Sequence, residues 1–193
     1  MAMHSVSDFI GELRERDLAR SNRYEIFFGL PQVLQGQVRT EQARIISMMA
    51  EDVLIPGMIL GTRPFRFNNL NEQRAHVIDF GGDSISFTFL VDGSWAAKDL
   101  FGDWMRKVVN TRNKRTVEYP DKYYATIDIH ALNRKDQKTA HWRIYDAFPR
   151  SIAPISASYQ NPEVMRLPVS FAYKNWEVIK TYNSEGNAGR VTE

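Results

Sequence analysis

Ser84 is the residue whose neighbours come nearest to a catalytic motif, because Gly82-Asp83-Ser84-Ile85 has the outline of a serine nucleophile turn. A nucleophilic serine needs a base within reach and a third group that orients the base. No histidine stands in an Asp-x-x-His context near the C-terminus; the four are His4, His76, His130 and His141. Ser84 also opens an alternating strand instead of a strand-to-helix turn. The sequence therefore predicts an ordinary strand start and no catalytic residue.

A metal site is the second chemical possibility. His130 and His141 fall on neighbouring predicted strands, where Asp128 would add a third ligand. Histidines on an exposed strand face are usually ordinary polar residues, however, and their spacing matches no known metal site. The glycines form no phosphate-binding loop that leads into a helix. We therefore expect no metal and no cofactor.

A basic run, RKVVNTRNKR at residues 106–115, contains no acidic residue. Its basic members are Arg106, Lys107, Arg112, Lys114 and Arg115. The run is either a surface for nucleic acid or an acidic partner, or the solvated C-terminal end of a helix, where cations are favoured. It has no interleaved aromatic residues for base stacking, and the net charge of the chain is only +2. A solvated helix end or a protein contact is therefore favoured over nucleic acid.

Composition limits the classes of fold. The 193 residues suit one domain with a substantial core, and 43% of them are apolar. The chain has no cysteine, which excludes disulfides and thiol catalysis. No apolar run approaches the ~20 residues of a membrane span, and no signal segment is recognisable at the N-terminus. We expect a protein made in the cytoplasm, without membrane insertion.

The elements that must position these residues are mostly strands. Hydrophobic periodicity predicts helices over residues 6–19 and from Thr40 through Val53, the second ended by Pro56-Gly57. Strands are predicted at residues 24–30, 123–132 and 140–147, the last two joined by a polar turn at 133–139. Residues 58–80 have the pattern of a long hairpin with its turn at 68–71. The tryptophans and tyrosines fall at core or subunit-interface spacing.

The strand at residues 84–91 gives the clearest face assignment. Ile85, Phe87, Phe89 and Val91 alternate with Ser84, Ser86 and Thr88. The apolar side is predicted to bind the next helix, which starts at Ser94 and presents core-facing residues. These are Ala97, Leu100, Phe101, Trp104, Met105 and Val108. The serine and threonine side chains then face away from the core.

The segment at residues 146–178 is the most distinctive part of the chain. Phe148-Pro149 and Ile152 begin a turn-rich connection, and residues 167–173 alternate bulky and small side chains. The alternation breaks at Lys174-Asn175, as at a β-bulge, and resumes with Trp176 and Val178. This segment closely resembles the end of the tail tube proteins of contractile-tailed bacteriophages, in which a Phe-Pro-x-x-Ile turn precedes a last strand ending in aromatic-Trp-Glu.

The resemblance covers residues 17–178. Residues 17–24, DLARSNRY, are similar to the approach to the family's first strand, although Ser21 stands where the family usually has proline. Leu54-Ile55-Pro56-Gly57 resembles the family's Leu-Pro-Gly-like turn. Residues 83–90, followed by Leu100-Phe101-x-x-Trp104, resemble the next strand and helix. The order and spacing of these segments carry the resemblance more than any one of them.

The resemblance implies a β-rich α+β fold: a single-domain β-sandwich or barrel with a flanking helix. An N-terminal helical arm (residues 1–21), a tail-tube β-domain (22–180) and a polar C-terminal tail (181–193) are the expected parts. It further implies hexameric rings whose inner sheets form a continuous β-barrel, stacked into a tube inside a contractile sheath. The expected partners are other copies, the tail sheath protein, baseplate tube proteins, a tape measure protein in the lumen and passing DNA. The expected location is the virion tail, after assembly in the host cytoplasm.

Site residues follow from this resemblance combined with strand parity. We expect six lumen-facing residues: Ser84, Ser86, Thr88, Thr126, Asp128 and Ser170. The hairpin is too long and charged for a core hairpin, so it is expected to reach the next ring together with the N-terminal arm. Its contact residues are Arg63, Arg66, Asn68, Asn69, Asn71, Glu72 and Arg74. The basic run becomes a sheath-contact candidate.

Three alternatives stay open. A baseplate tube-initiator ring, or the inner tube of a related contractile injection system, shares the same resemblance. A split-barrel flavin-binding enzyme would also be small, β-rich and oligomeric, but would be yellow on purification. A nucleic-acid-binding barrel would bind DNA as a free protomer with strong salt dependence.

Overall fold

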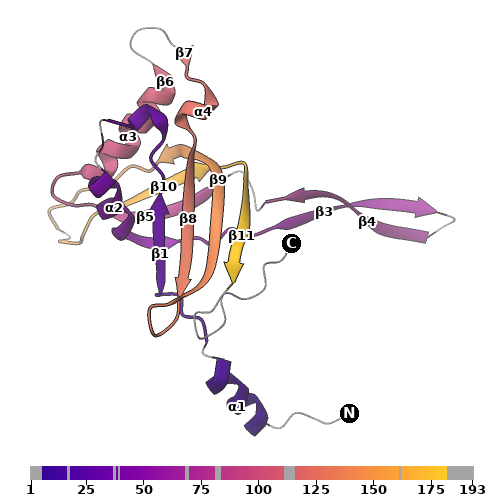
Figure 1. The fold of residues 1–193 in the computed structure, drawn as a ribbon. Coiled ribbons are helices and arrows are strands. Elements are labelled where there is room, and N and C mark those ends of the chain that lie inside the picture. Colours follow the sequence, from indigo (N-terminus) through magenta and orange to yellow (C-terminus); the bar gives the residue numbers. More distant parts are fainter. Residues whose placement is uncertain are drawn as a thin grey trace.

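The computed structural model describes residues 6–16, 18–36, 38, 40–67, 70–80, 84–110, 116–160 and 162–181. Seven strands form one continuous path in the order β1-β8-β9-β10-β5-β2, with β11 added to β9 (Figure 1). Their bounds are β1 Tyr24–Phe28, β2 Ala50–Val53, β5 Ile85–Leu90, β8 Ala125–Leu132, β9 Lys138–Ile152, β10 Arg166–Ala172 and β11 Asn175–Thr181. All the pairings are antiparallel.

The long strand β9 divides this path into two packed layers. Residues 138–147 of β9 lie between β8 and β11, and residues 148–152 pair with β10. We call the layer of β1, β8, β11 and the first part of β9 the β8 sheet. The layer of β2, β5, β10 and the second part of β9 is the β5 sheet. Asp146, with φ 54°, stands where β9 passes from one layer to the other.

The predicted interruption near Lys174 is real, but it is not a simple β-bulge. Strand β10 ends at Ala172 and β11 begins at Asn175. The two strands pair one after the other with the same edge of β9. The Lys174 backbone N–H donates to the Tyr145 carbonyl at 3.1 Å, beside the bend at Asp146. The break is therefore the corner at which the β9–β10 ladder changes layer. Phe148 and Pro149, expected in a turn, belong to β9.

The core lies between the two layers and is rich in phenylalanine. The Phe28 ring lies 5.5–6.2 Å from the rings of Phe87, Phe89, Phe101 and Phe171. The isoleucines of the β8 sheet close the other side: Ile26, Ile127, Ile129 and Ile144. The predicted inward face of residues 85–89 is confirmed, since Ile85, Phe87 and Phe89 are all at most 1% exposed.

Helix α3 (Ala96–Val108) covers one end of this core, as the sequence predicted. Leu100, Phe101 and Trp104 are buried, and the Phe101 ring lies 4.9 Å from that of Phe89. The Trp104 indole N–H donates to the Tyr123 carbonyl at 2.9 Å, which satisfies its one polar atom. The helix begins at Ala96 and not at Ser94, because an Asp92 carboxylate oxygen accepts the Ala96 backbone N–H at 3.0 Å.

The second predicted helix is wrong in its last turn. Helix α2 (Thr40–Met48) stops before Met49, and residues 50–53 form β2, paired with β5. Ala50 and Val53 lie opposite Phe89 and Phe87, so pairing with a buried strand overrides the helical periodicity of this segment. The short elements η1 (Gln32–Leu34), α4 (Pro120–Tyr123), β6 (Val109–Asn110) and β7 (Thr116–Val117) were not predicted.

Two elements project from the domain (Figure 1): helix α1 (Val6–Arg16) and the predicted hairpin, β3 (Ile59–Phe67) with β4 (Leu70–Asp79). The base of the hairpin is tied to the corner after β10. The Trp176 indole N–H reaches the Gly57 and Phe80 carbonyls at 3.0 and 3.2 Å, and the Tyr173 hydroxyl also donates to Phe80. No helix among the described residues is long and apolar enough to span a bilayer.

Candidate assembly surfaces

The outward side of the β5 sheet carries a row of serines that we call the serine face: Ser86, Ser170 and Ser151. Ser86 lies opposite Ser170, and Ser170 lies opposite Ser151. The Ser86 and Ser170 hydroxyl oxygens are 3.0 Å apart. Thr88 extends this side of the sheet, and Ser84 directly precedes β5. The structure thus brings four of the six predicted lumen residues to one surface.

The other two predicted lumen residues, Thr126 and Asp128, lie on the outward side of the β8 sheet. Their neighbours Ile127 and Ile129 point into the core, so strand parity turns Thr126 and Asp128 the other way. The two outward sides lie on opposite sides of the core. The six predicted lumen residues therefore do not share one surface of the protomer.

Asp128 is the centre of a polar cluster on the β8 sheet. It accepts hydrogen bonds from Arg143 at 2.7 Å and contacts His141 Nε2 at 2.8 Å. Burial opposes its ionisation, but these two partners outweigh burial and lower the pKa of the Asp128 carboxyl. His141 and His130 are direct cross-strand neighbours, as the sequence suggested.

His130 is the one strongly perturbed member of this cluster. It is 7% exposed, and its Nδ1 atom has no hydrogen-bond partner among the described residues. Burial and the proximity of His141, at 4.2 Å between ring centroids, lower the pKa of His130 to about 4. In the described part of the chain, no group of three or more His, Asp or Glu side chains is placed to hold a metal ion.

The β3–β4 hairpin exposes both charged and apolar side chains. Arg63 lies directly opposite Arg74, an unfavourable pairing within one ribbon. Arg74 is partly compensated, because its guanidinium lies 4.0 Å from the Phe65 ring centroid and 3.2 Å from Glu72. Leu70 is 72% exposed, and Arg66 lies opposite Asn71. Asn68 and Asn69 lie outside the described residues.

The basic run is already partly engaged within the chain. Arg106 forms an ion pair with Asp103 at 2.6 Å, and the Lys107 ammonium donates to the Val33 carbonyl at 2.8 Å. Arg112, Lys114 and Arg115 lie outside the described residues. The role of this run as a sheath contact stays a prediction.

A gap that sequence analysis missed separates β1 from β2, and we call it the seam. No backbone pairing joins these two strands in the described chain, so the path of strands is not closed into a barrel. The Tyr24 hydroxyl bridges the gap by donating to the Ala50 and Glu51 carbonyls. The sequence pattern predicted a helix at residues 50–53, so it gave no indication that a strand edge, and with it the seam, lies there.

The seam is hollow on both sides of Tyr24. One hollow, of about 620 Å³, is lined by residues that include Ser21, Glu51 and Asp52. The other, of about 390 Å³, lies between β1 and α2 and is lined by Glu25, Phe27, Arg44 and Met48, among others.

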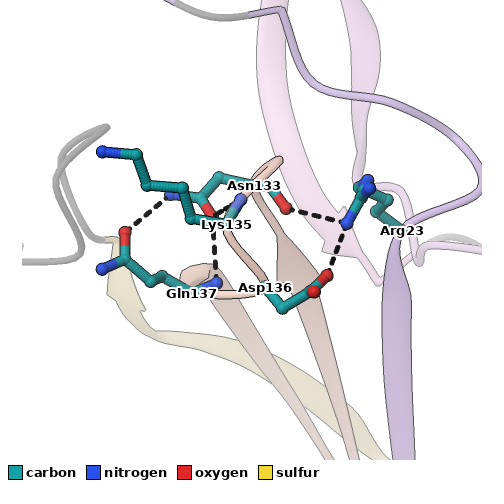
Figure 2. A network of polar contacts seen from close by, with 5 residues as sticks. All are labelled: Arg23, Asn133, Lys135, Asp136 and Gln137. Atoms are coloured by element: carbon teal, nitrogen blue, oxygen red, sulfur yellow. Dashed lines mark hydrogen bonds and ion pairs between the residues drawn. The ribbon is translucent and has the colours of Figure 1, made fainter.

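A turn network fixes the start of β1 next to the seam. In Figure 2, the Asn133 side chain accepts the backbone N–H groups of Lys135 and Gln137, at 2.8 and 2.9 Å. Arg23 contacts Asp136 in the same turn and donates to the Asn133 carbonyl at 3.4 Å. The predicted polar turn between β8 and β9 is confirmed. It holds β1 against β8 at its entrance.

Comparison with known proteins agrees with this fold. A family model described as phage tail tube protein matches residues 19–179. A chain of the anti-feeding prophage baseplate superposes with a TM-score of 0.60 at 14% identity, covering 83% of this chain and 95% of the other. A chain of the PVC sheath-tube complex, an extracellular contractile injection system, gives 0.57 at 14% identity, covering 91% and 98%. No match was found among curated protein sequences.

Proposed function

Because the chain belongs to the phage tail tube protein family, we propose that it is the protomer of a tail tube, forming hexameric rings that stack inside a contractile sheath. The observation that carries this proposal is the family match over residues 19–179, which spans the sheet domain except for the last two residues of β11. The tube would form the channel through which DNA enters the host. Its function would lie in surfaces, with no chemistry required.

Ring formation is supported by the unpaired edges of the domain. Among the described residues, β1, β2 and β11 each pair with a single strand, and unpaired edges favour association with further strands. Head-to-tail pairing of such edges gives a closed ring when the rotation between copies closes. A barrel built from many strands leaves an aqueous lumen.

The serine face is the proposed lining of the lumen, together with Ser84 and Thr88. Its side chains are small and neutral, whereas a lining rich in lysine or arginine would hold DNA through its phosphates. Arg166, on the neighbouring part of β10, is neutralised by Glu51 at 2.6 Å. Thr126 and Asp128 lie on the opposite side of the protomer, and we leave them out of the proposed lining.

The hairpin and the N-terminal arm are the proposed stacking elements. Val6 and Phe9 on α1 are 74% and 61% exposed, and the hairpin is exposed along both strands. Apolar surface of this kind marks an interaction site in a soluble protein. The sheath, the baseplate and a tape measure protein in the lumen are the further partners we propose, with the basic run at residues 106–115 facing the sheath.

A baseplate ring that initiates the tube is the second candidate, since one of the similar folds comes from a baseplate and another from a sheath-tube complex. The inner tube of a contractile injection system is equally compatible with these folds. Addition of the protein to purified baseplates distinguishes a tube protomer from a baseplate initiator. A tube protomer elongates the baseplates into tubes of variable length, whereas an initiator adds one ring and stops.

Negative-stain microscopy of the purified protein tests the main proposal. We expect rings or tubes at high protein concentration, and elongation when baseplates are added. A strictly monomeric protein that baseplates fail to seed contradicts it. A colourless preparation with no DNA binding at low salt would also argue against the flavin-enzyme and nucleic-acid alternatives.

A further inference from the structure

Helix α1 projects from the domain although one of its sides is apolar. It has 11 residues with Gly11 near its centre, and an isolated helix of this length is only marginally stable in water. Val6, Phe9 and Ile10 have the spacing of one helix side, and all three side chains are exposed. In Figure 1, α1 lies apart from the sheets, and no other element of the described chain packs extensively against it. The helix therefore lacks an apolar surface that would stabilise it.

The hollow between β1 and α2 offers such a surface. Its volume is about 390 Å³, and its lining residues Phe27 and Met48 have exposed side chains. Ile45, about one turn before Met48 on α2, is also exposed. Of the two charged lining residues, Arg44 is already paired with Glu41 at 2.7 Å. The apolar side of a helix therefore fits this hollow better than a charged segment does.

The chain between α1 and β1 is long enough to bring the helix to this hollow. Residues 17–23 join Arg16, the last residue of α1, to Tyr24, which itself lines the hollow. Such a link spans at most about 25 Å when extended, and the helix is about 16 Å long. Figure 1 shows α1 beyond the end of the sheets at which β1 begins. A tether this short gives an effective concentration in about the millimolar range, so even a weak contact is populated in a dilute protomer.

We propose that α1 folds back in the free protomer and places its apolar side in the hollow between β1 and α2, and that assembly requires its release. The docked helix would cover the free edge of β1, one of the edges on which ring formation depends. It would also withdraw the N-terminal arm from other copies. Because exposed strand edges and apolar surface favour uncontrolled association, this cover would keep dilute protomers apart. The inference rests on the proposed self-assembly of the chain and adds a restraint on it.

Cross-linking of the dilute, unassembled protein tests the docked position. The chain has no native cysteine, so a short, reducible bismaleimide joins only the designed positions in Phe9→Cys with Met48→Cys. We expect a link within one chain, with a yield that stays the same on about tenfold dilution. Phe9→Cys with Lys174→Cys is the control and should stay unlinked, because Lys174 directly precedes β11, at the opposite edge of the β8 sheet from β1. Absence of the link between positions 9 and 48, or equal linking in the control, overturns the inference.

The linked protomer also tests whether release is required. At a protein concentration where the unlinked Phe9→Cys, Met48→Cys variant forms tubes, the linked form should stay monomeric by sedimentation. Cleavage of the linker with a reducing agent should restore tube growth. A linked protomer that assembles as fast as the cleaved one overturns the requirement for release.

Weakening the hollow should have the opposite effect on assembly. Ile45→Gln with Met48→Gln removes exposed apolar surface from α2 and leaves the arm intact, so a larger fraction of protomers is undocked. The lag before tube growth should shorten by about threefold or more, because assembly follows the competent fraction. Val117→Gln, at an exposed position on β7 beside the basic run, is the matched control and should keep the wild-type lag. A longer lag in the α2 variant would place its two residues in a contact between copies and overturn the inference.

Microscopy of the same samples distinguishes failure of the docking from failure of the tube function. Tubes that grow from a protein whose free protomer gives no link overturn the docking of α1 and leave the tube function standing. A protomer that links when dilute but never forms tubes, alone or with baseplates, supports the docked helix and counts against the tube function. A monomer that forms neither links nor tubes counts against both.

Discussion

At the scale of single residues, His130 is the group whose environment differs most from water. Burial and the neighbouring His141 lower its pKa to about 4, and its Nδ1 atom has no partner among the described residues. The sequence placed His130 and His141 on adjacent strands, but it gave no register and no burial for either side chain. Its pKa therefore could not be predicted before the strands were paired.

Acid should weaken the fold through His130. The unfolded chain binds the His130 proton near pH 6.5 and the folded chain only near pH 4, so the unfolded state holds more protons between these values. The free energy of unfolding should fall by about 3 kcal/mol as the pH drops through that window. Urea denaturation of wild type and His130→Gln at several pH values checks this.

The variant should lose that part of the pH dependence. His76→Gln, on the exposed β4 strand, keeps the buried histidine and should retain the wild-type slope. An identical slope in His130→Gln and wild type would show that His130 does not titrate as its burial requires.

The serine face gives a second prediction at this scale. Ser86→Cys is a conservative change next to Ser170, and the thiol should react with a small maleimide in intact tubes. A maleimide too bulky for the bore should label it only after the tubes are disassembled. Lys98→Cys on α3 is the control and should react with both reagents at every stage. Equal labelling of Ser86→Cys in intact tubes by both reagents places it outside the lumen.

At the scale of elements, the local hydrophobic pattern was sufficient to predict a strand and its inward side wherever only one face of the strand is buried. The alternation in β5 and the spacing in α3 predicted the contact between Phe89 and Phe101 correctly. The pattern failed at residues 50–53, where apolar spacing suits a helix as well as a short edge strand, and only the partner β5 decides between them. That error also hid the seam, since a gap between two strands is invisible until both strands are assigned.

The hairpin is the element whose removal should separate folding from assembly. Deleting residues 68–73 removes the tip and shortens both strands, while the hydrogen bonds from Trp176 to Gly57 and Phe80 remain at the base. We expect circular dichroism and the melting temperature to stay close to wild type, because none of the described side chains of the hairpin belongs to the buried core. Tube length by microscopy should fall sharply, and tubes of normal length would contradict a role in stacking.

At the scale of the whole molecule, the two sheets are one unit because they share β9 and one core. Phe171 is fully buried in the β5 sheet and lies 5.6 Å from Phe28 of the β8 sheet. The overall class, a β-rich domain of two packed sheets with a helix alongside, was predictable from the strand count and the resemblance. The division of β9 between the layers was not, because it depends on the bend at Asp146.

Damage to the shared core should therefore weaken both sheets together. Phe171→Ala should lower the free energy of unfolding by about 3–5 kcal/mol through the loss of buried area and the cavity that remains. Urea curves followed by far-UV circular dichroism and by tryptophan fluorescence should shift together, with coincident midpoints. Two separated transitions would show that the β8 and β5 sheets unfold independently.

The pairing of β1 with β8 also has a consequence for the time course of folding. Tyr24 lies opposite Ala131, so the first strand of the domain waits for a partner more than a hundred residues further along the chain. Contacts of this sequence separation slow folding, to the millisecond-to-second range in sheet proteins, whereas a hairpin such as β3–β4 closes in about 1–10 μs. The exposed hairpin thus exists before the edge of β1 is in place. The assembly of newly made chains must therefore wait for the slower pairing of β1 with β8, which completes the β8 sheet long after the hairpin has closed.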